Sequence, residues 1–274
     1  MNSIGIGPGK EFSLRISVAA IVAVKFTDPE NNKTLLALER AATVHTKNEK
    51  PEVTVKAKPF GGGARLLDPE RLSKLIGGFN FDSERSLKEE DFRILTNPVS
   101  WEKIKKICIA HLEETDNGIL DTGPERELEE EFEDCLSIKI RPEDYSLKDK
   151  GMVIEDSPVN TKNINAPGSP TVRVYYLYEA LIKNRQIIDL AMNNSKRYSD
   201  DDLAGMAHQD LKKGGKGRAN AVLVVDPDKL RRFYHSVPTG KQGELIKFEE
   251  HLLDGNVPAL FEDISSHKYQ RILT

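Results

Sequence analysis

The pattern of hydrophobic and polar residues near the start of the chain predicts β-strands. The apolar run at 14–26, LRISVAAIVAVKF, is rich in β-branched residues and is typical of a buried strand. A polar turn and a second apolar run at 33–40 follow, so 14–40 is predicted to form a hairpin. The alternating stretch at 52–58, EVTVKAK, predicts a half-exposed strand. This strand leads directly into Pro59, Phe60, Gly61, Gly62 and Gly63.

The period of the pattern changes in the segment 66–115. Apolar residues such as Leu72, Leu75 and Ile76 recur there at helical spacing, which predicts a mainly helical segment. The elements expected after it are an acidic helix at 121–136, strands at 136–141 and 171–182, a long loop at 156–170, helical residues at 184–213 interrupted near Ser199, and a basic loop at 212–218. A strand at 220–226, a helix starting at Pro227 and an amphipathic helix near 244–253 complete the expected order.

This order of elements is mixed, because a hairpin, a helical segment, strands and further helices follow one another without a regular repeat. It predicts an α+β or α/β layered domain, with a sheet between helices, rather than the regular alternation of a doubly wound sheet.

Composition and charge narrow the class of protein. The 274 residues, 38% of them hydrophobic, suffice for one large domain or two small ones. The formal net charge of −4 provides no basic field, so neither a nucleic acid nor an anionic membrane is an expected partner. Only two cysteines are present, the N-terminal residues do not predict a signal peptide, and no apolar stretch is long enough to span a membrane. We therefore predict a cytoplasmic protein.

The acidic stretch at 121–136, DTGPERELEEEFEDCL, is the main candidate for chemistry. Thr122 and Glu125 have the spacing of a capping box, which predicts that the helix begins at Asp121 or Thr122. At about 100° per residue, one arc of the helix carries acidic side chains and a neighbouring arc carries apolar ones. The acidic arc comprises Glu127, Glu130, Glu131 and Asp134, and the apolar arc comprises Leu128, Phe132, Cys135 and Leu136.

Two interpretations of this acidic arc remain open. Carboxylates at i,i+4 repel each other, and a hard divalent cation such as Mg²⁺ or Mn²⁺ would remove that repulsion. Mg²⁺ is usually shared between carboxylates and substrate phosphates, so the chemistry would be phosphate chemistry. Alternatively, the acidic arc is a solvated helix face, which is the usual role of a charge run.

The residues RELEEEF at 126–132 resemble the core of the Nudix box, G-x5-E-x7-R-E-U-x-E-E-x-G-U, in which U is apolar. The strands expected at 14–40 are similar to the opening strands of that family, and PFGGGAR at 59–65 resembles its Pro-Gly-Gly segment. VRVYYLYEA and VLVVDPDKLRRF resemble its later strands and closing helix. The resemblance implies a single Nudix-like domain over 1–274, with a mixed sheet between helices, a helical insertion at about 66–115 and a second insertion at about 184–218.

The chain departs from the box in its first half. In strict register, Leu112 and Gly118 occupy the positions of the first Gly and first Glu of the box, and Glu133 and Asp134 replace its last Gly and apolar residue. The glycines lie instead at 61–63, and 62 residues separate Gly63 from Arg126, so the helical insertion would interrupt the box. No glutamate matches the glycine-side half.

The resemblance also implies roles for individual residues. Glu127, Glu130 and Glu131 would bind Mg²⁺ or Mn²⁺, Arg126 would orient the carboxylates, and Arg126, Glu130 and Glu131 would serve catalysis. The substrate-binding residues would be Gly61, Gly62, Gly63 and Arg65. The general base is not identified by the sequence, and the candidates are Glu179, Asp201 and Asp210.

Three functions follow from these expectations. The first is a Mg²⁺-dependent pyrophosphohydrolase that cleaves a diphosphate bond in a nucleoside diphosphate derivative. The second is a Nudix-like protein that binds a nucleotide or a partner without turnover. The third is an α+β interaction protein whose acidic helix is solvated. The expected ligand is a small molecule of the nucleoside diphosphate type, and the sequence leaves a homodimer open.

Other signals favour ordinary structural roles. The loop KKGGKGR at 212–218 lacks the full spacing of a phosphate-binding loop and is interpreted as a mobile basic loop, or as a lid over a substrate phosphate if the family resemblance holds. The six histidines show no spacing typical of zinc. Cys108 and Cys135 are expected in the core, and alternation places Tyr176 and Tyr178 on one strand face and Tyr175 on the other.

Overall fold

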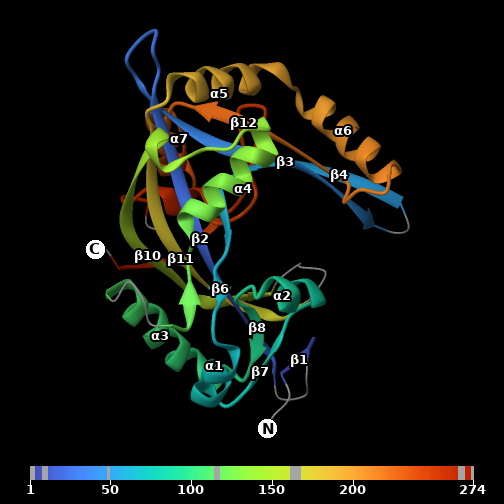
Figure 1. Cartoon of the computed structure of the whole chain (residues 1–274), viewed down its shortest axis with the longest axis vertical. Helices are drawn as coiled ribbons and strands as arrows, with labels where there is room; N and C mark the ends of the chain where they lie inside the picture. The colour runs from blue at the N-terminus through green and yellow to red at the C-terminus, as the bar shows by residue number, and fades with distance from the viewer. Residues whose placement is uncertain are drawn as a thin grey trace.

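The computed structural model describes residues 4–7, 12–47, 50–113, 118–160, 168–264 and 269–272. In these parts of the chain, thirteen strands form one mixed sheet and two short strands form a separate ladder (Figure 1). The helices are α1 (Pro69–Ile76), α2 (Glu84–Glu89), α3 (Trp101–Glu113), α4 (Pro124–Leu136), α5 (Arg185–Arg197), α6 (Asp200–Lys212) and α7 (Pro227–Ser236). The strands are β1 (Gly5–Ile6), β2 (Leu14–Thr27), β3 (Thr34–Lys47), β4 (Lys50–Lys58), β5 (Phe60–Gly63), β6 (Arg65–Leu66), β7 (Phe79–Phe81), β8 (Arg93–Thr96), β9 (Leu120–Asp121), β10 (Tyr145–Asn160), β11 (Pro170–Ile182), β12 (Arg218–Val225), β13 (Ile246–Phe248), β14 (His251–Leu253) and β15 (Tyr269–Ile272). The large mixed sheet with separate helices confirms the predicted α+β class.

Strand β2 is the centre of the sheet because both of its edges are paired. β11 runs parallel to it along one edge. Along the other edge β8, β5 and β3 follow one another, all antiparallel. Almost every residue of β2 is buried, which explains its continuous apolar sequence. The predicted hairpin at 14–40 is confirmed by the pairing of β2 with β3, and β3 continues to Lys47.

The sheet divides where β3 separates from β2. Beyond Ala37, β3 pairs with β4 on one edge, and β12 pairs along its other edge. The chain crosses from the β3 arm to the β2 arm between Lys58 and Phe60, so β5 with its three glycines lies at the division. Helix α4 contacts β5, β2 and β12 and therefore covers the point at which the two arms separate.

Helices cover both faces of the sheet. Val22, Val24 and Phe26 of β2 share one face and pack against α4 and α5; we call this the α4 face. Ala23 of β2 faces the other way, into a second core formed with α7. Alternation along β3 places Leu36, Leu38 and Ala42 on this opposite face, where Leu203 and Ala207 of α6 pack against Ala42.

The segment 66–115 contains α1, α2 and α3, as predicted from its period, and also β7 and β8, which were not predicted. β8 extends the edge of β2, so this segment is part of the main sheet. Its two ends meet, because β6 pairs with β9 through Arg65↔Asp121 and Leu66↔Leu120, and Leu67 N donates to Ile119 O at 2.8 Å. The chain therefore returns, just before α4, to the point at which it left β5.

Several predicted elements are confirmed. The helical residues at 184–213 form α5 and α6, and Ser199 is the N-cap of α6 with a capping box to Asp202. β12 lies where a strand was expected at 220–226, and Pro227 is the first residue of α7, with Asp226 as N-cap. None of the helices in the described ranges is long and apolar enough to cross a membrane.

Three predicted elements are wrong in whole or in part. Residues 136–141 are not a strand: Leu136 ends α4, Ser137 has φ 56°, and β11 pairs instead with β10. Residues 244–253 are not a helix, because β13 and β14 form a hairpin there and β14 joins β4. In the loop expected at 156–170, residues 156–160 belong to β10, and 161–167 lie outside the described residues.

Candidate functional site

Helix α4 begins at Pro124, and its start differs from the predicted capping box. Gly123 is the N-cap in the left-handed conformation, with φ 42° and no side-chain cap. The hydroxyl of Thr122 lies 2.7 Å from the hydroxyl of Tyr178 on β11 and does not cap the helix. The capping box of Thr122 and Glu125 is therefore wrong, because Thr122 joins α4 to the sheet instead.

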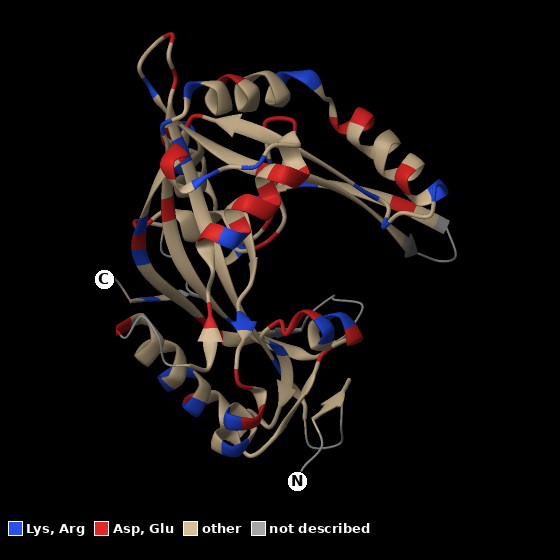
Figure 2. Cartoon of the chain, viewed as in Figure 1, with Lys and Arg blue, Asp and Glu red and all other residues tan. Residues whose placement is uncertain are grey.

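The apolar arc of α4 packs on the sheet as predicted. Leu128, Phe132 and Cys135 are buried in the core of the α4 face, and the ring of Phe132 stacks on that of Phe60 at 5.4 Å between centroids. This packing fixes the rotation of the helix about its axis. It turns Glu127 and Glu131 towards β5, β4 and β3 and leaves Glu130 and Asp134 exposed. Figure 2 shows the acidic residues along the ribbon of α4.

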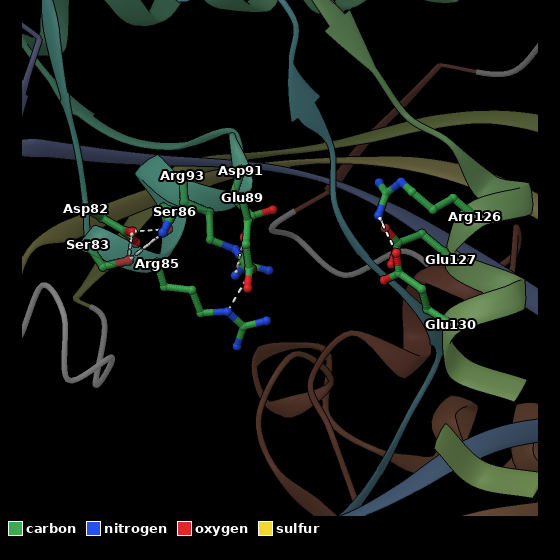
Figure 3. Close-up of polar contacts among 10 residues, drawn as sticks. All are labelled: Asp82, Ser83, Arg85, Ser86, Glu89, Asp91, Arg93, Arg126, Glu127 and Glu130. Atoms are coloured by element: carbon green, nitrogen blue, oxygen red, sulfur yellow. Dashed lines mark hydrogen bonds and ion pairs between the residues drawn. The ribbon is translucent and has the colours of Figure 1, made fainter. Parts of the chain in front are cut away.

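Glu127 lies directly over the glycine strand. The residue is 4% exposed, and a Cβ added to Gly62 would overlap its Oε2 atom. Only glycine therefore allows the strand and the carboxylate to approach this closely. Nη1 of Arg126 lies 2.7 Å from Oε1 of Glu127 (Figure 3). Burial raises the pKa of Glu127 to about 7, against the opposing effect of Arg126.

Glu131, one turn further along α4, meets a charged pair from the sheet. Its Oε1 lies 3.5 Å from Nζ of Lys58 on β4, and Lys58 also contacts the carboxylate of buried Glu39 on β3. Burial, together with the neighbouring Glu39 carboxyl group, raises the pKa of Glu131 to about 10. Burial alone would lower the pKa of Lys58, but Glu39 and Glu131 together raise it. Two carboxyl groups thus share one lysine beneath the helix.

Glu130 points away from these buried groups. Its side chain is 62% exposed, and Oε1 lies 3.4 Å from Nη1 of Arg126 (Figure 3). Nε and Nη2 of Arg126 are buried and have no hydrogen-bond partner in the described part of the chain. Arg126 therefore joins Glu127 and Glu130 through Nη1, and its Nε and Nη2 nitrogens retain three N–H groups.

A further carboxylate reaches the glycine strand from the segment 66–115. A Cβ added to Gly63 would overlap Oδ1 of Asp91, which is 7% exposed and lies 2.9 Å from Nη1 of Arg93. Burial raises the pKa of Asp91, and its charge is one of the influences that raise the pKa of Glu127. Figure 3 shows Asp91 on the opposite side of the strand from Glu127, beside Arg85 and Glu89 of α2.

The other predicted site residues have more peripheral positions. Gly61 has φ 132°, and a Cβ there would overlap Ala20 O of β2. Arg65 is exposed and lies 3.5 Å from Glu90.

The three candidates for the general base do not join the α4 carboxylates. Glu179 pairs with Lys25 at 2.6 Å, and alternation along β11 places it on the face opposite α4. Asp201 lies in the first turn of α6, whose buried residues pack on that same opposite face. Asp210 accepts hydrogen bonds from the amides of Gly217 and Arg218.

Asp91, Glu39 and Lys58 were not predicted to belong to the site. Glu39 interrupts the apolar residues of the strand 33–40 at a position that alternation places on the same face as Ala37. A charged residue on the inward face of a strand needs a partner, and this was the available signal. Asp91 carried no such signal, because the strand β8 beside it was not predicted.

The residue types beneath α4 are suited to bind a divalent cation. Oε2 of Glu131 is buried and receives no hydrogen bond from any described residue, and carboxylate oxygens are the ligands that Mg²⁺ and Mn²⁺ prefer. Among the described residues, however, no three His, Cys, Asp or Glu side chains converge so that they could hold a metal ion. Glu127 turns towards Arg126 and Glu131 towards Lys58, so both would have to rotate from these cations to share one ion.

Comparison of the chain with protein-family models, with curated proteins and with solved structures gave no match. A functional assignment therefore rests on the residues beneath α4.

Proposed function

We propose that the protein is a Mg²⁺- or Mn²⁺-dependent hydrolase of the Nudix type that cleaves a diphosphate bond in a nucleoside diphosphate derivative. The observation that carries this proposal is the contact between Gly62 and Glu127. In the family resemblance these residues would correspond to the two halves of the box, and they lie together although a long segment of the chain separates them. A helix that is merely solvated, the third function considered, does not account for the burial of Glu127 or for the Glu131 side chain, which is only 15% exposed.

Each side chain would have a distinct task. Glu127 and Glu131, joined by Glu130, would hold the cation, which would neutralise a diphosphate and lower the pKa of a bound water molecule. Arg126 would keep Glu127 and Glu130 in place and offer the N–H groups of Nε and Nη2 to a phosphate oxygen. Gly62 would allow the backbone to approach the helix closely.

Incubation with a panel of nucleoside diphosphate derivatives and Mg²⁺ tests this function. We expect turnover that falls at least a hundredfold in Glu130→Gln and in Glu131→Gln, because each removes a metal-ligand charge. Gly62→Ala should also reduce turnover, because the added Cβ displaces Glu127. Gly205→Ala is the matched control: a Cβ there meets nothing within 4 Å, and turnover should stay at the wild-type level.

The second candidate is a nucleotide-binding protein without turnover. It is favoured by the outward position of Glu130 and by the engagement of Glu131 with Lys58, which leave the carboxylates unconverged. Binding of a panel member without product, unchanged by Glu130→Gln, would replace the hydrolase with this second function. Turnover that is the same in wild type, Glu130→Gln and Glu131→Gln would refute the catalytic assignment.

A further inference from the structure

A groove of about 850 Å³ lies between the last turn of α4, the end of α5, α6 and the loop that follows α6. Its wall contains four cationic side chains, Arg197, Lys213, Lys216 and Arg218. The carboxylates in the wall are those of Asp134 and Asp210. None of the four cations forms an ion pair with a carboxylate of the described residues, so the groove has an excess of positive charge in a chain of net charge −4.

The cations of a cavity on the opposite face of the sheet differ from those of the groove, because they are paired with carboxylates. Lys25, Lys150 and Arg231 line that cavity, and each pairs with a carboxylate, namely Glu179, Glu262 and Asp263. Cations that are already paired contribute little to the binding of an external anion. The four cations of the α4–α6 groove have no such carboxylate partner among the described residues.

The basic loop in the groove wall has a defined conformation. The carboxylate of Asp210 accepts hydrogen bonds from Gly217 N at 2.8 Å and from Arg218 N at 3.2 Å. A Cβ added to Gly215 would overlap the same carboxylate, and Gly217 has φ 66°. The carboxylate of Asp210 is thus engaged by N–H groups of the loop backbone. The loop was expected to be mobile, but these bonds tie it to α6 with its cationic side chains beside the groove.

The floor of the groove offers a backbone donor. Among the described strands β12 pairs only with β3, and the N–H groups of Val222 and Val224 on its outer edge donate to Asn194 at 2.8 Å and Ser195 at 2.9 Å. Alternation directs the N–H of Asn220 to the same edge, where it meets no acceptor in the described ranges, and Asn220 is one of the residues that line the groove. An unpaired N–H beside guanidinium and ammonium groups is suited to a phosphate oxygen.

We propose that this groove binds a phosphorylated small molecule through its phosphate groups, held by Lys216, Arg218 and the amide of Asn220. Arg197 lies over the ring of Tyr198 with 5.1 Å between the guanidinium carbon and the ring centroid, so a flat cation–π pair borders the same groove. A nucleotide has both the phosphates and the flat ring that this arrangement accepts. The binding does not depend on hydrolysis or on a metal ion.

The test is titration calorimetry of the full chain in EDTA, with inorganic tripolyphosphate and ATP as separate probes. EDTA removes the metal that the α4 carboxylates would need, so failure of the hydrolase proposal and failure of this one are distinguishable. We expect binding that weakens as ionic strength rises and that falls at least tenfold in Lys216→Gln/Arg218→Gln. Lys212→Gln is the matched control, because Lys212 is a neighbouring exposed lysine outside the groove wall. It should change affinity less than twofold.

The two probes distinguish phosphate recognition from nucleotide recognition. Equal affinities show that the phosphates alone are bound, whereas tighter binding of ATP that is lost in Tyr198→Ala shows that the base stacks on the ring. Both results support the proposal. It is overturned if neither probe binds, if Lys212→Gln weakens binding as much as the double variant, or if a single-stranded RNA binds where the small probes do not. Circular dichroism of each variant shows that loss of binding is not loss of fold.

Discussion

At the scale of single residues, the position of Glu127 requires glycine at residue 62 and withholds its carboxyl group from water. Burial that raises the pKa of a carboxyl group stabilises the protonated form in the folded state. The unfolded chain has no such burial, so the two states bind protons differently between the two pKa values. The burial of Glu127 is therefore visible in how the stability of the metal-free protein depends on pH.

The predicted consequence is a pH-dependent effect of Glu127→Gln, measured by urea unfolding in EDTA. The pKa is about 7 in the folded state and 4.5 in the reference state, so the stabilisation from protonated Glu127 is complete below pH 4.5 and lost as pH rises through 7. Gln mimics the protonated form. The variant should match wild type near pH 4.5 and exceed it by about 3 kcal/mol above pH 7.

The difference between variant and wild type isolates Glu127 from the other titrating groups. Glu125→Gln is a suitable control, because Glu125 lies on the same helix and is exposed. Its effect should be small and nearly independent of pH. A Glu127→Gln effect that is the same at pH 4.5 and pH 8 would show that Glu127 is not buried as described.

At the scale of elements, β3 and β4 hold a charge pair whose third member comes from α4. Lys58→Met removes the cation between Glu39 and Glu131 and leaves two buried carboxyl groups side by side. Removal of one partner of a buried ion pair typically costs about 3–5 kcal/mol. We expect a loss of this order at pH 8 in the free energy of unfolding.

A second change should restore much of that loss. In Glu39→Gln/Lys58→Met, the buried charge that Lys58 compensated is itself removed, so the double variant should be more stable than Lys58→Met alone. The measurement is a double-mutant cycle by chemical denaturation. Additive losses would show that the two side chains do not interact in the folded protein.

Elements with strong local signals could be predicted from the sequence. β2, β3 and β4 have apolar or alternating patterns, and α7 begins with Asp226 and Pro227, which cap and start a helix. The errors arose where tertiary contacts override local pattern. Ile138 and Ile140 alternate as in a strand, but they pack into the core of the α4 face in a segment without strand pairing. The amphipathic pattern near 244–253 forms a hairpin because β14 finds a partner in β4.

The candidate site could be predicted only in part, for a similar reason. The spacing along α4 indicates Glu127 and Glu131 as neighbours on one arc. It does not indicate which of them faces the sheet, because that depends on the packing of Phe132 against Phe60. Asp91 and Glu39 come from β-structure far away in the sequence, and only the fold brings them to the glycine strand and the helix.

At the scale of the whole molecule, the segment 66–115, which is called the insertion below, is part of the core. Side chains of β2 and β11, such as Ile16 and Val174, are buried in one hydrophobic cluster with Leu72, Phe79 and Ile104 of the insertion. The hydroxyl of Tyr176 donates to Cys108 O at 2.7 Å. Although the ends of the insertion meet, its residues cover the half of the α4 face that α4 and α5 do not reach.

Removal of the insertion should therefore unfold the protein. In a variant in which a short Gly-Ser linker replaces residues 67–119, several large side chains lose their cover, each worth about 1.5–3 kcal/mol. The sum exceeds the usual stability of a domain, about 5–15 kcal/mol. We expect an aggregated product or one without a cooperative thermal transition.

The same linker inserted after exposed Glu30 is the control, because residues 29–33 of this turn are exposed. That variant should unfold cooperatively near the wild-type temperature. A soluble deletion variant with a wild-type transition would show that the insertion is an independent unit.

The ladder of β6 and β9 closes the long loop between Gly63 and Arg126, and this closure has an entropic cost. Loop-closure entropy grows only with the logarithm of loop length, so extending a connection from about a dozen residues to 62 costs about 1.4 kcal/mol. Burial of a single leucine such as Leu72 offsets that cost. Two segments separated by 62 residues are thus barely harder to bring together than two separated by about a dozen, provided that the intervening residues build core of their own.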